Sequence, residues 1–392
     1  MAKCDAIRLT LSQQGRRAKM SSRSLCVFLS TTLPISAYSA ILLFGSHGAS
    51  SASDAGPTLS SLATARGFTI GAGASDPEEL DDKTYANLAA TEYNAIEPGN
   101  VMKMYVLEPS RGVYDLSQSD RVVSFAQAHR LKVTASAPIW DGNPTDYGTG
   151  NPSWLSKGRF TSAELKSILR DYIMAIMQHD HRNYPGVVSR WAVVSEATHL
   201  CGQFCAGLGN GASGFPAYVA LAYEDARAAD PTVQLCYDDF DGEGLGETSD
   251  KVYKLVSYLK SKGLVDCVGF EGQWEGEGLG EIPPAADITA NINRLGALGL
   301  SVYFSQVEIG LPVTKGVAGD VASEADQAAQ ANAYSTLLHT CLATVACKGF
   351  FTWGITDKFA FCYKAGMCAP LPFDRDYHPK PAYYALQSAL AG

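Results

Sequence analysis

The chain has 392 residues, a formal net charge of −9, and 46% hydrophobic against 18% charged residues. This composition is typical of a folded globular protein and excludes a largely disordered chain. No Lys/Arg cluster occurs beyond the N-terminus, which argues against a nucleic-acid partner, because such a partner requires a basic face.

The N-terminal segment predicts a secretory signal. The basic stretch GRRAKMSSR precedes a mostly apolar run at 25–44, and small residues follow that run. Because this order is typical of a cleaved signal peptide, residues 1–52 are expected to be signal and disordered segment, starting at Met1 or Met20. The mature protein is then secreted, extracellular and free of the membrane. The alternative is a signal anchor, because about 20 apolar residues can span a bilayer.

The cysteine count fits a secreted chain. Ten cysteines become eight when Cys4 and Cys26 leave with the signal, and an even number suits a set of disulfides. Eight cysteines allow roughly a hundred connectivities, of which short spacing favours three local pairs and leaves two cysteines over. The favoured pairs are Cys201/Cys205, Cys341/Cys347, Cys362/Cys368 and Cys236/Cys267. No cofactor or metal is expected, since no cysteine cluster has zinc-ligand spacing with a histidine partner.

Short apolar runs alternate with longer amphipathic segments from residue 66 to the C-terminus. The segment at 162–178 has apolar residues three and four apart, which predicts a helix with Ser162 as its N-cap. The apolar runs predict buried strands. These runs lie at 67–73, 93–96, 132–140, 191–196, 233–240, 267–272, 302–309 and 349–354.

Strands that alternate with helices pair in parallel through crossovers. Eight such units over 66–392 predict a single (β/α)8 TIM barrel as the only folded domain. The alternative is an open doubly wound sheet, which is disfavoured because no G-x-G-x-x-G motif follows the first strand.

A barrel of this kind carries its active site at the C-terminal ends of the strands. Glu196 ends one predicted strand and Glu308 ends another, so both carboxylates are expected to face a shared cleft. Amides, indoles and charged groups follow other strands, and such a rim is typical of a sugar site. These residues are Asn100, Lys103, Trp140, Gln273, Trp353 and Asp357.

Each glutamate by itself fits a salt-bridged rim residue, but the pair together with the aromatic residues predicts a glycosidase. Carboxyl groups about 5–5.5 Å apart would give retention of configuration, and about 6.5–9.5 Å would give inversion. The sequence leaves that choice open.

Seven segments, in order, resemble glycoside hydrolase family 10, the retaining endo-β-1,4-xylanases. WAVVSEA is similar to the family's WDVVNEA, VGFEGQW to IG-x-Q-x-H, and VEIG to TELD. The matching segments span 93–129, 191–197, 233–241, 268–274, 307–310, 341–361 and 373–386.

The resemblance implies that Glu196 is the acid/base and that Glu308 is the nucleophile. It also implies a disulfide between Cys341 and Cys347. No cofactor is implied, and we expect a monomer whose substrate is an oligosaccharide, a polysaccharide or a plant glycoside.

The chain departs from the family pattern at residues that would contact the sugar. Ser195 replaces the Asn before the acid/base, and Gln273 replaces a His near the nucleophile. Ser136 and Asp141 stand where the family has two histidines, and Glu271 replaces a neutral Gln.

These departures leave three interpretations. We expect a retaining, xylanase-like hydrolase of plant cell-wall polysaccharide, as a divergent member of the family. The first alternative is a glycosidase of the same family that acts on a plant saponin or glycoalkaloid, like a tomatinase. The second is a non-catalytic, carbohydrate-binding or inhibitor-like barrel.

Overall fold

The computed structural model describes residues 56–142, 150–274, 276, 278–316, 319–362 and 364–392. The predicted signal and N-terminal segment at 1–52 lies outside the described residues. Within the described ranges, no helix is both long enough and apolar enough to cross a bilayer.

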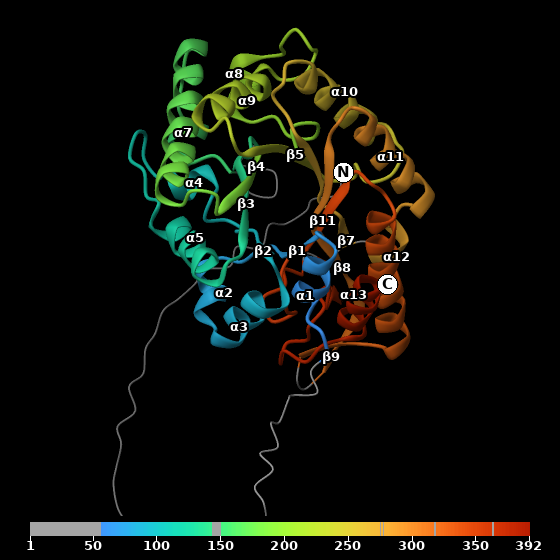
Figure 1. The fold of residues 1–392 in the computed structure, drawn as a ribbon. Coiled ribbons are helices and arrows are strands. Elements are labelled where there is room, and N and C mark those ends of the chain that lie inside the picture. Colours follow the sequence, from blue (N-terminus) through green and yellow to red (C-terminus); the bar gives the residue numbers. More distant parts are fainter. Residues whose placement is uncertain (1–55, 143–149, 275, 277, 317–318, 363) are drawn as a thin grey trace, which may run out of the picture. The chain divides into compact units, whose positions relative to one another are not determined.

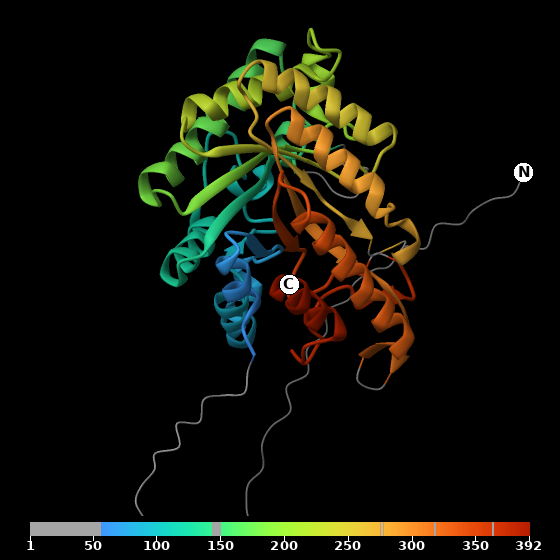
Figure 2. The same ribbon diagram turned by 45° about the vertical axis from the view of Figure 1, so that its right-hand side comes forward.

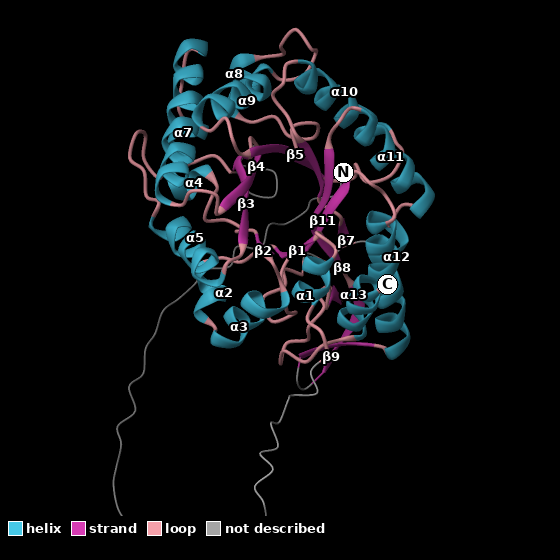
Figure 3. Cartoon of the chain, viewed as in Figure 1, coloured by secondary structure: helices cyan, strands magenta, loops and turns pink. Residues whose placement is uncertain are grey.

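Eight parallel strands close into a barrel, with helices outside them (Figures 1 and 3). Going round the barrel, each strand pairs with the next, and β11 pairs with both β8 and β1. The strands are β1 (Thr69–Ala72), β2 (Ala95–Ile96), β3 (Lys132–Ile139), β4 (Val188–Ser195), β5 (Gln234–Asp239), β6 (Cys267–Phe270), β8 (Ser301–Ile309) and β11 (Cys347–Thr352). The predicted single (β/α)8 barrel is therefore confirmed, and each predicted apolar run supplies one strand.

Four short strands were not predicted. Strand β7 (Gln273–Trp274) pairs with the end of β8, outside the closed ring. A separate small sheet has the order β10-β9-β12. Its strands are β9 (Leu311–Gly316), β10 (Gly319–Ala322) and β12 (Met367–Cys368).

The helices surround the strands in both views (Figures 1 and 2). Helix α7 begins one residue earlier than predicted, because Thr161 rather than Ser162 is the N-cap, in a capping box with Glu164. The helices are α1 (Leu59–Ala65), α2 (Pro77–Asp81), α3 (Lys83–Glu92), α4 (Met104–Leu107), α5 (Ser117–His129), α6 (Ser153–Ser156), α7 (Ser162–Asn183), α8 (Gln203–Leu208), α9 (Ala217–Ala229), α10 (Glu247–Ser261), α11 (Ala285–Ala297), α12 (Glu324–Leu342) and α13 (Pro381–Ala391), with a 3-10 helix at Gly278–Glu281.

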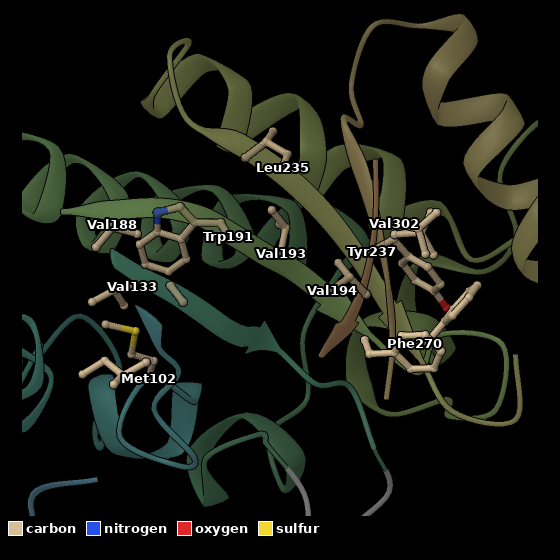
Figure 4. Packing of buried hydrophobic residues seen from close by; sticks show 14 of the residues in the cluster. Met102, Val133, Val188, Trp191, Val193, Val194, Leu235, Tyr237, Phe270 and Val302 are labelled. Atoms are coloured by element: carbon tan, nitrogen blue, oxygen red, sulfur yellow. The ribbon is translucent and has the colours of Figure 1, made fainter. Parts of the chain in front are cut away.

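The main hydrophobic core lies between strands and helices. Trp191, Val193 and Leu235 belong to it and are buried from solvent (Figure 4). The inside of the barrel is more polar: Arg190 is buried there, with its guanidinium 3.9 Å from the ring centroid of Tyr303. The barrel thus places charged groups beneath the ends of its own strands.

Four disulfides occur in the described part of the chain, and they are the pairs favoured from the sequence. Cys236–Cys267 joins the neighbouring strands β5 and β6, whose Cα atoms are 4.3 Å apart at this bond. The other three close short loops: Cys201–Cys205, Cys341–Cys347 and Cys362–Cys368.

Candidate active site

The C-terminal ends of the barrel strands surround a cleft of about 490 Å³. Most of the predicted site residues line it, namely Asn100, Lys103, Trp140, Ser195, Glu196, Gln273 and Trp353. The predicted site did not include the other residues that line it, namely Ala74, Asp76, Glu79, Gly99, Tyr105, Ala137, Glu271, Gln306, Phe359 and Phe361. The strand ends therefore form one open site that combines carboxylates, amides and aromatic rings.

Glu196 occupies the first position after β4, with a φ of 59°. Its N–H donates to the backbone oxygen of Asp238 at 2.9 Å, and its own oxygen accepts from the N–H of His199 at 3.0 Å. Ala74 and Ala137, which also line the cleft, have φ values of 45° and 40°. This left-handed region costs a non-glycine residue about 1–3 kcal/mol, so three residues of the cleft wall carry backbone strain. The strained turn fixes the direction in which the Glu196 carboxyl leaves the strand.

Burial raises the pKa of Glu196 above its ordinary value, and the negative charge of Asp239 acts in the same direction. The Trp140 indole and the positive charges of Lys103 and His199 act against them. A carboxyl with a raised pKa keeps its proton closer to neutral pH. This is the property required of a general acid that protonates a leaving group.

Lys103 projects into the cleft beside an aromatic wall. Its Nζ lies 4.4 Å from the centroid of the Trp140 ring and donates to Oδ1 of Asn100 at 3.1 Å. Burial lowers the pKa of Lys103, while the negative charges of Glu196 and Asp76 oppose that shift. Lys103 therefore supplies a positive charge that faces the acids of the cleft.

Asp76 shapes the loop that carries Asn100. Its carboxylate accepts hydrogen bonds from the N–H of Gly99 at 2.9 Å, of Asn100 at 2.8 Å and of Val101 at 3.4 Å. The sequence offered one signal for this role of Asp76. An aspartate at the N-cap position before a helix, here α2, accepts backbone hydrogen bonds.

Ser195 ends β4 directly before Glu196 and lines the cleft. Its side chain is 2% exposed, and its Oγ has no hydrogen-bond partner among the described residues. A buried hydroxyl without a partner costs free energy until something binds it. Ser195 therefore leaves an unpartnered hydroxyl at the cleft wall, and its predicted contact with a sugar stays a prediction.

Aromatic rings form part of the cleft wall. Trp140, Trp353 and Tyr105 line it together with Phe359 and Phe361. Gly73 permits this arrangement, because a Cβ at that position would lie 2.5 Å from Cε3 of Trp353. Flat apolar faces beside polar groups suit a sugar ring, which has both apolar faces and polar edges.

His199 and Asp239 form a second pair next to Glu196. Nδ1 of His199 lies 2.9 Å from Oδ1 of Asp239, and the imidazole stacks on Phe240 at 4.0 Å. Burial lowers the pKa of His199, but the hydrogen bond and charge of Asp239 outweigh burial, so the pKa is raised. Sequence reasoning missed His199, for which no motif gives a signal.

Glu308 was expected to meet Glu196 across the cleft, and this placement stays a prediction. Glu308 is 1% exposed and is absent from the described residues that line the cleft, whereas Gln306 is among them. Glu308 is instead in register with Gln273 of β7, and the side chain of Gln273 donates from Nε2 to Oε1 of Gln306 at 2.6 Å. The side chain that β8 contributes to the described cleft wall is therefore the amide of Gln306.

Glu271 brings a further carboxyl to the site from the corner between β6 and β7. It lines the cleft, is 1% exposed, and neither carboxyl oxygen has a hydrogen-bond partner in the described part of the chain. Burial raises its pKa well above the ordinary value, and the negative charge of Glu196 is the largest further cause. The sequence marked Glu271 as a departure from the family, but the predicted site did not include it.

Asp357, which was expected to contact substrate, forms a buried ion pair in this structure. Its Oδ2 accepts from Nζ of Lys380 at 2.9 Å, and each side chain is only 7% exposed. Its Oδ1 accepts from the N–H of Leu371 at 2.8 Å. Asp357 is not among the described residues that line the cleft, and its predicted contact with substrate stays a prediction.

One group of described residues offers atoms that could hold a metal ion, away from the cleft. Asp120, His179 and Asp180 place their ligand atoms within 4.8 Å of one another. Nε2 of His179 already lies 2.7 Å from Oδ1 of Asp120, as an ion pair between α5 and α7. This contact accounts for the grouping without a metal.

The comparisons with known proteins agree with this geometry. The family model described as glycosyl hydrolase family 10 matches residues 58–389. The chain belongs to glycosyl hydrolase family 10.

The family's relatives cover most of this chain at low identity. An endo-1,4-beta-xylanase of Agaricus bisporus is 30% identical over 335 residues, covering 84% of this chain and 93% of the relative. A glycosylated endo-beta-1,4-xylanase of Gloeophyllum trabeum superposes with a TM-score of 0.74 at 27% identity, covering 86% and 99%. Xylanase 10B of Thermotoga petrophila, solved with xylobiose, gives a TM-score of 0.71 at 26% identity, covering 85% and 97%. The expectation of a divergent, xylanase-like glycoside hydrolase acting on O-glycosyl bonds is confirmed.

The structure explains one departure from the family 10 pattern. Asp141, which stands at a histidine position, is fully buried and accepts from the N–H of Phe204 at 3.1 Å and of Cys205 at 2.7 Å. It also accepts from Nδ2 of Asn151 at 2.7 Å. Asp141 therefore anchors the disulfide loop after Glu196.

Proposed function

We propose that this family 10 chain is a retaining glycoside hydrolase that cleaves internal β-1,4 linkages of plant cell-wall xylan. The observation that carries the proposal is the Glu196 carboxyl, which a strained turn directs into an aromatic-walled cleft at the strand ends. The raised pKa of Glu196, caused first by burial, suits an acid that protonates the glycosidic oxygen. The names of the relatives, which are endo-1,4-beta-xylanases, support xylan as the substrate.

The proposed reaction is a double displacement. In the first step, a carboxylate of the cleft attacks the anomeric carbon while Glu196 gives its proton to the departing sugar oxygen, which leaves a glycosyl ester. In the second step, Glu196 takes a proton from a water molecule whose oxygen attacks the anomeric carbon and releases the carboxylate. Lys103 and Trp140 orient the sugar beside Glu196, as their positions in the cleft wall support.

Ser195 supports a second candidate substrate. Its side chain is shorter than the asparagine of the family pattern, and its free hydroxyl lies directly beside Glu196 in the cleft. A site that binds the sugar through a shorter residue also accommodates a different glycone. Hydrolysis of a plant saponin or glycoalkaloid is therefore the alternative that the test below must include.

We further propose that the protein acts as a secreted monomer. Four disulfides support a route through an oxidising compartment, because such bonds are rare in reducing ones. The test is expression of the full chain in a secreting host. N-terminal sequencing of the medium protein is expected to find a start after the predicted signal, and light scattering is expected to give the mass of one chain. Retention of the protein in the membrane fraction would contradict secretion.

The activity test compares the purified protein with its Glu196→Ala variant on xylan, mixed-linkage β-glucan and a steroidal glycoalkaloid. Release of new reducing ends from xylan by the wild type alone is the expected result. NMR of the first product is expected to show retained β configuration. Turnover of the glycoalkaloid but not of xylan would establish the alternative. A Glu196→Ala variant that keeps the activity of the wild type would contradict the assignment of Glu196 to the active site.

A further inference from the structure

The hydrogen bond between Gln273 and Gln306 changes how the TELD motif fits this chain. Gln273 stands where the resemblance has the histidine next to the nucleophile, and its Nε2 reaches Gln306 at 2.6 Å. Moving the motif two residues toward the N-terminus places TELD on residues 305–308, Ser-Gln-Val-Glu. Every replacement is then conservative in size and shape, from Thr to Ser, Glu to Gln, Leu to Val and Asp to Glu. The nucleophile position therefore holds Gln306.

A second departure complements the first. In the family's IG-x-Q-x-H segment, the residue two before the histidine is a glutamine, and here it is Glu271. Strands β6 and β8 are neighbours in the barrel, with Phe270 in register with Phe304. Glu271 and Gln306 follow these two residues closely, and both line the cleft. Compared with the family pattern, the ends of β6 and β8 have thus exchanged a carboxylate and an amide.

We propose that Glu271, at the end of β6, is the catalytic nucleophile of this chain, in place of a carboxylate on β8. This inference rests on the proposed function as a retaining glycosidase. The amide of Gln306 has no negative charge with which to attack the anomeric carbon. Glu308 is a buried residue of β8 in register with Gln273, and its backbone N–H donates to the oxygen of Gly272 at 3.2 Å.

The surroundings of Glu271 fit this role. Neither of its oxygens is held by a hydrogen bond within the described residues, so the carboxylate is free to react, unlike that of Asp141 or Asp357. Lys103, Glu196 and Glu271 all line the same cleft, so the lysine brings a positive charge to the wall that carries both acids. The backbone on either side of Glu271 is fixed, because its N–H donates to Asp239 O at 3.2 Å and the N–H of Gly272 donates to Glu243 at 2.9 Å.

In the first step, one Glu271 oxygen bonds to the anomeric carbon as the bond from that carbon to the leaving sugar oxygen breaks. The leaving oxygen receives the proton of Glu196. In the second step, the oxygen of a water molecule bonds to the anomeric carbon, the ester bond to Glu271 breaks, and Glu196 takes up a water proton. Both carboxyl groups then return to their starting protonation.

The test compares four variants of the secreted protein that change only a carboxylate or an amide: Glu271→Gln, Glu308→Gln, Gln306→Glu, and the double exchange Glu271→Gln/Gln306→Glu. Glu271→Gln is expected to lose about 10³-fold or more in kcat on the substrate found active, as for removal of other nucleophiles. The double exchange restores the family arrangement and is expected to recover at least about tenfold over Glu271→Gln. Circular dichroism and thermal melts of each variant separate loss of chemistry from loss of fold.

Covalent labelling locates the nucleophile independently of any variant. An activated 2-deoxy-2-fluoro-β-xylobioside traps the glycosyl ester of a retaining enzyme, and mass spectrometry of peptides identifies the residue that carries it. A label on Glu271 is the expected result. A label on Glu308, an unchanged kcat in Glu271→Gln, or an inverted product would overturn the inference while leaving a hydrolase. A wild type with neither turnover nor label would overturn the proposed function itself.

Discussion

Gln273 on β7 donates a hydrogen bond of 2.6 Å to Gln306 on β8, and both amides line the same cleft as Glu196. The contact joins β8 to β7, the strand that follows the corner carrying Glu271. The β8 side chain that lines the cleft is thus a neutral amide. In the proposed mechanism the two catalytic carboxylates are therefore Glu196, after β4, and Glu271, after β6.

Replacing Glu196 by alanine is expected to lower kcat on xylan by about 10²–10⁴-fold, because the leaving oxygen then departs without a proton donor. An aryl xylobioside with a good leaving group needs little protonation and is expected to lose much less in the glycosylation step. Steady-state kinetics on both substrates check this difference. Equal losses on the two substrates would show that Glu196 does not act as the acid.

Replacing Ser195 by asparagine is expected to raise kcat/KM on xylo-oligosaccharides, by about tenfold. The longer amide restores a contact to the sugar 2-hydroxyl, which strengthens in the transition state. The matched control is Ser195→Ala, which removes the unpartnered hydroxyl and is expected to lower kcat/KM. A loss in both variants would mean that the cleft has no room for the asparagine side chain and that the glycone site is already optimal.

Replacing Asp357 by asparagine is expected to reduce the free energy of unfolding by about 3–5 kcal/mol, because it leaves the buried Lys380 ammonium without its partner. KM of the folded variant is expected to stay within about twofold, since Asp357 does not line the cleft. Urea unfolding and kinetics measure both quantities. The double variant Asp357→Leu/Lys380→Met, which removes both charges, is expected to recover part of the stability. A large rise in KM without destabilisation would restore Asp357 as a substrate contact.

The pH dependence of activity follows from the pKa of Glu271, which burial and then the charge of Glu196 raise well above 4.5. A nucleophile must be ionised, so activity falls as the pH drops through this pKa. The acidic limb of kcat/KM is therefore expected above pH 4.5, and Gln306→Glu, with Glu271 retained, is expected to move it. A limb at or below pH 4.5 in the wild type would mean that Glu271 does not control ionisation of the free enzyme.

Stability is expected to decrease with rising pH because of Glu243, whose burial raises its pKa to about 7 from an ordinary 4.5. Between these two pH values the folded protein binds more protons than the unfolded chain, so the free energy of unfolding falls as the pH rises. A fully buried acid with this shift contributes at most about 3 kcal/mol. Urea unfolding of the wild type and Glu243→Gln at pH 5 and pH 8 checks the effect, and the variant is expected to show the smaller difference. Equal pH slopes would exclude Glu243 as the cause.

The sequence by itself determined the barrel, its strands and the position of Glu196. Apolar runs with amphipathic segments between them specify buried strands and outer helices. Because parallel strands all end at one rim, polar residues after these runs had to gather there. Short spacing indicated three of the disulfide pairs, and Cys236 and Cys267 were the two cysteines left over.

Only the tertiary structure decided which residue of β8 faces the cleft. Ser305 lines the small cavity inside the barrel and the adjacent Gln306 lines the cleft, although neighbouring residues of a regular strand point to opposite faces. The pairing with β11 shifts between Phe304 and Val307, where an irregularity interrupts the alternation. Gln306 and Glu308 are two residues apart, so the alternation along a strand assigns both to the same face, and sequence spacing could not distinguish them. The packing of β7 beside β8 made that choice.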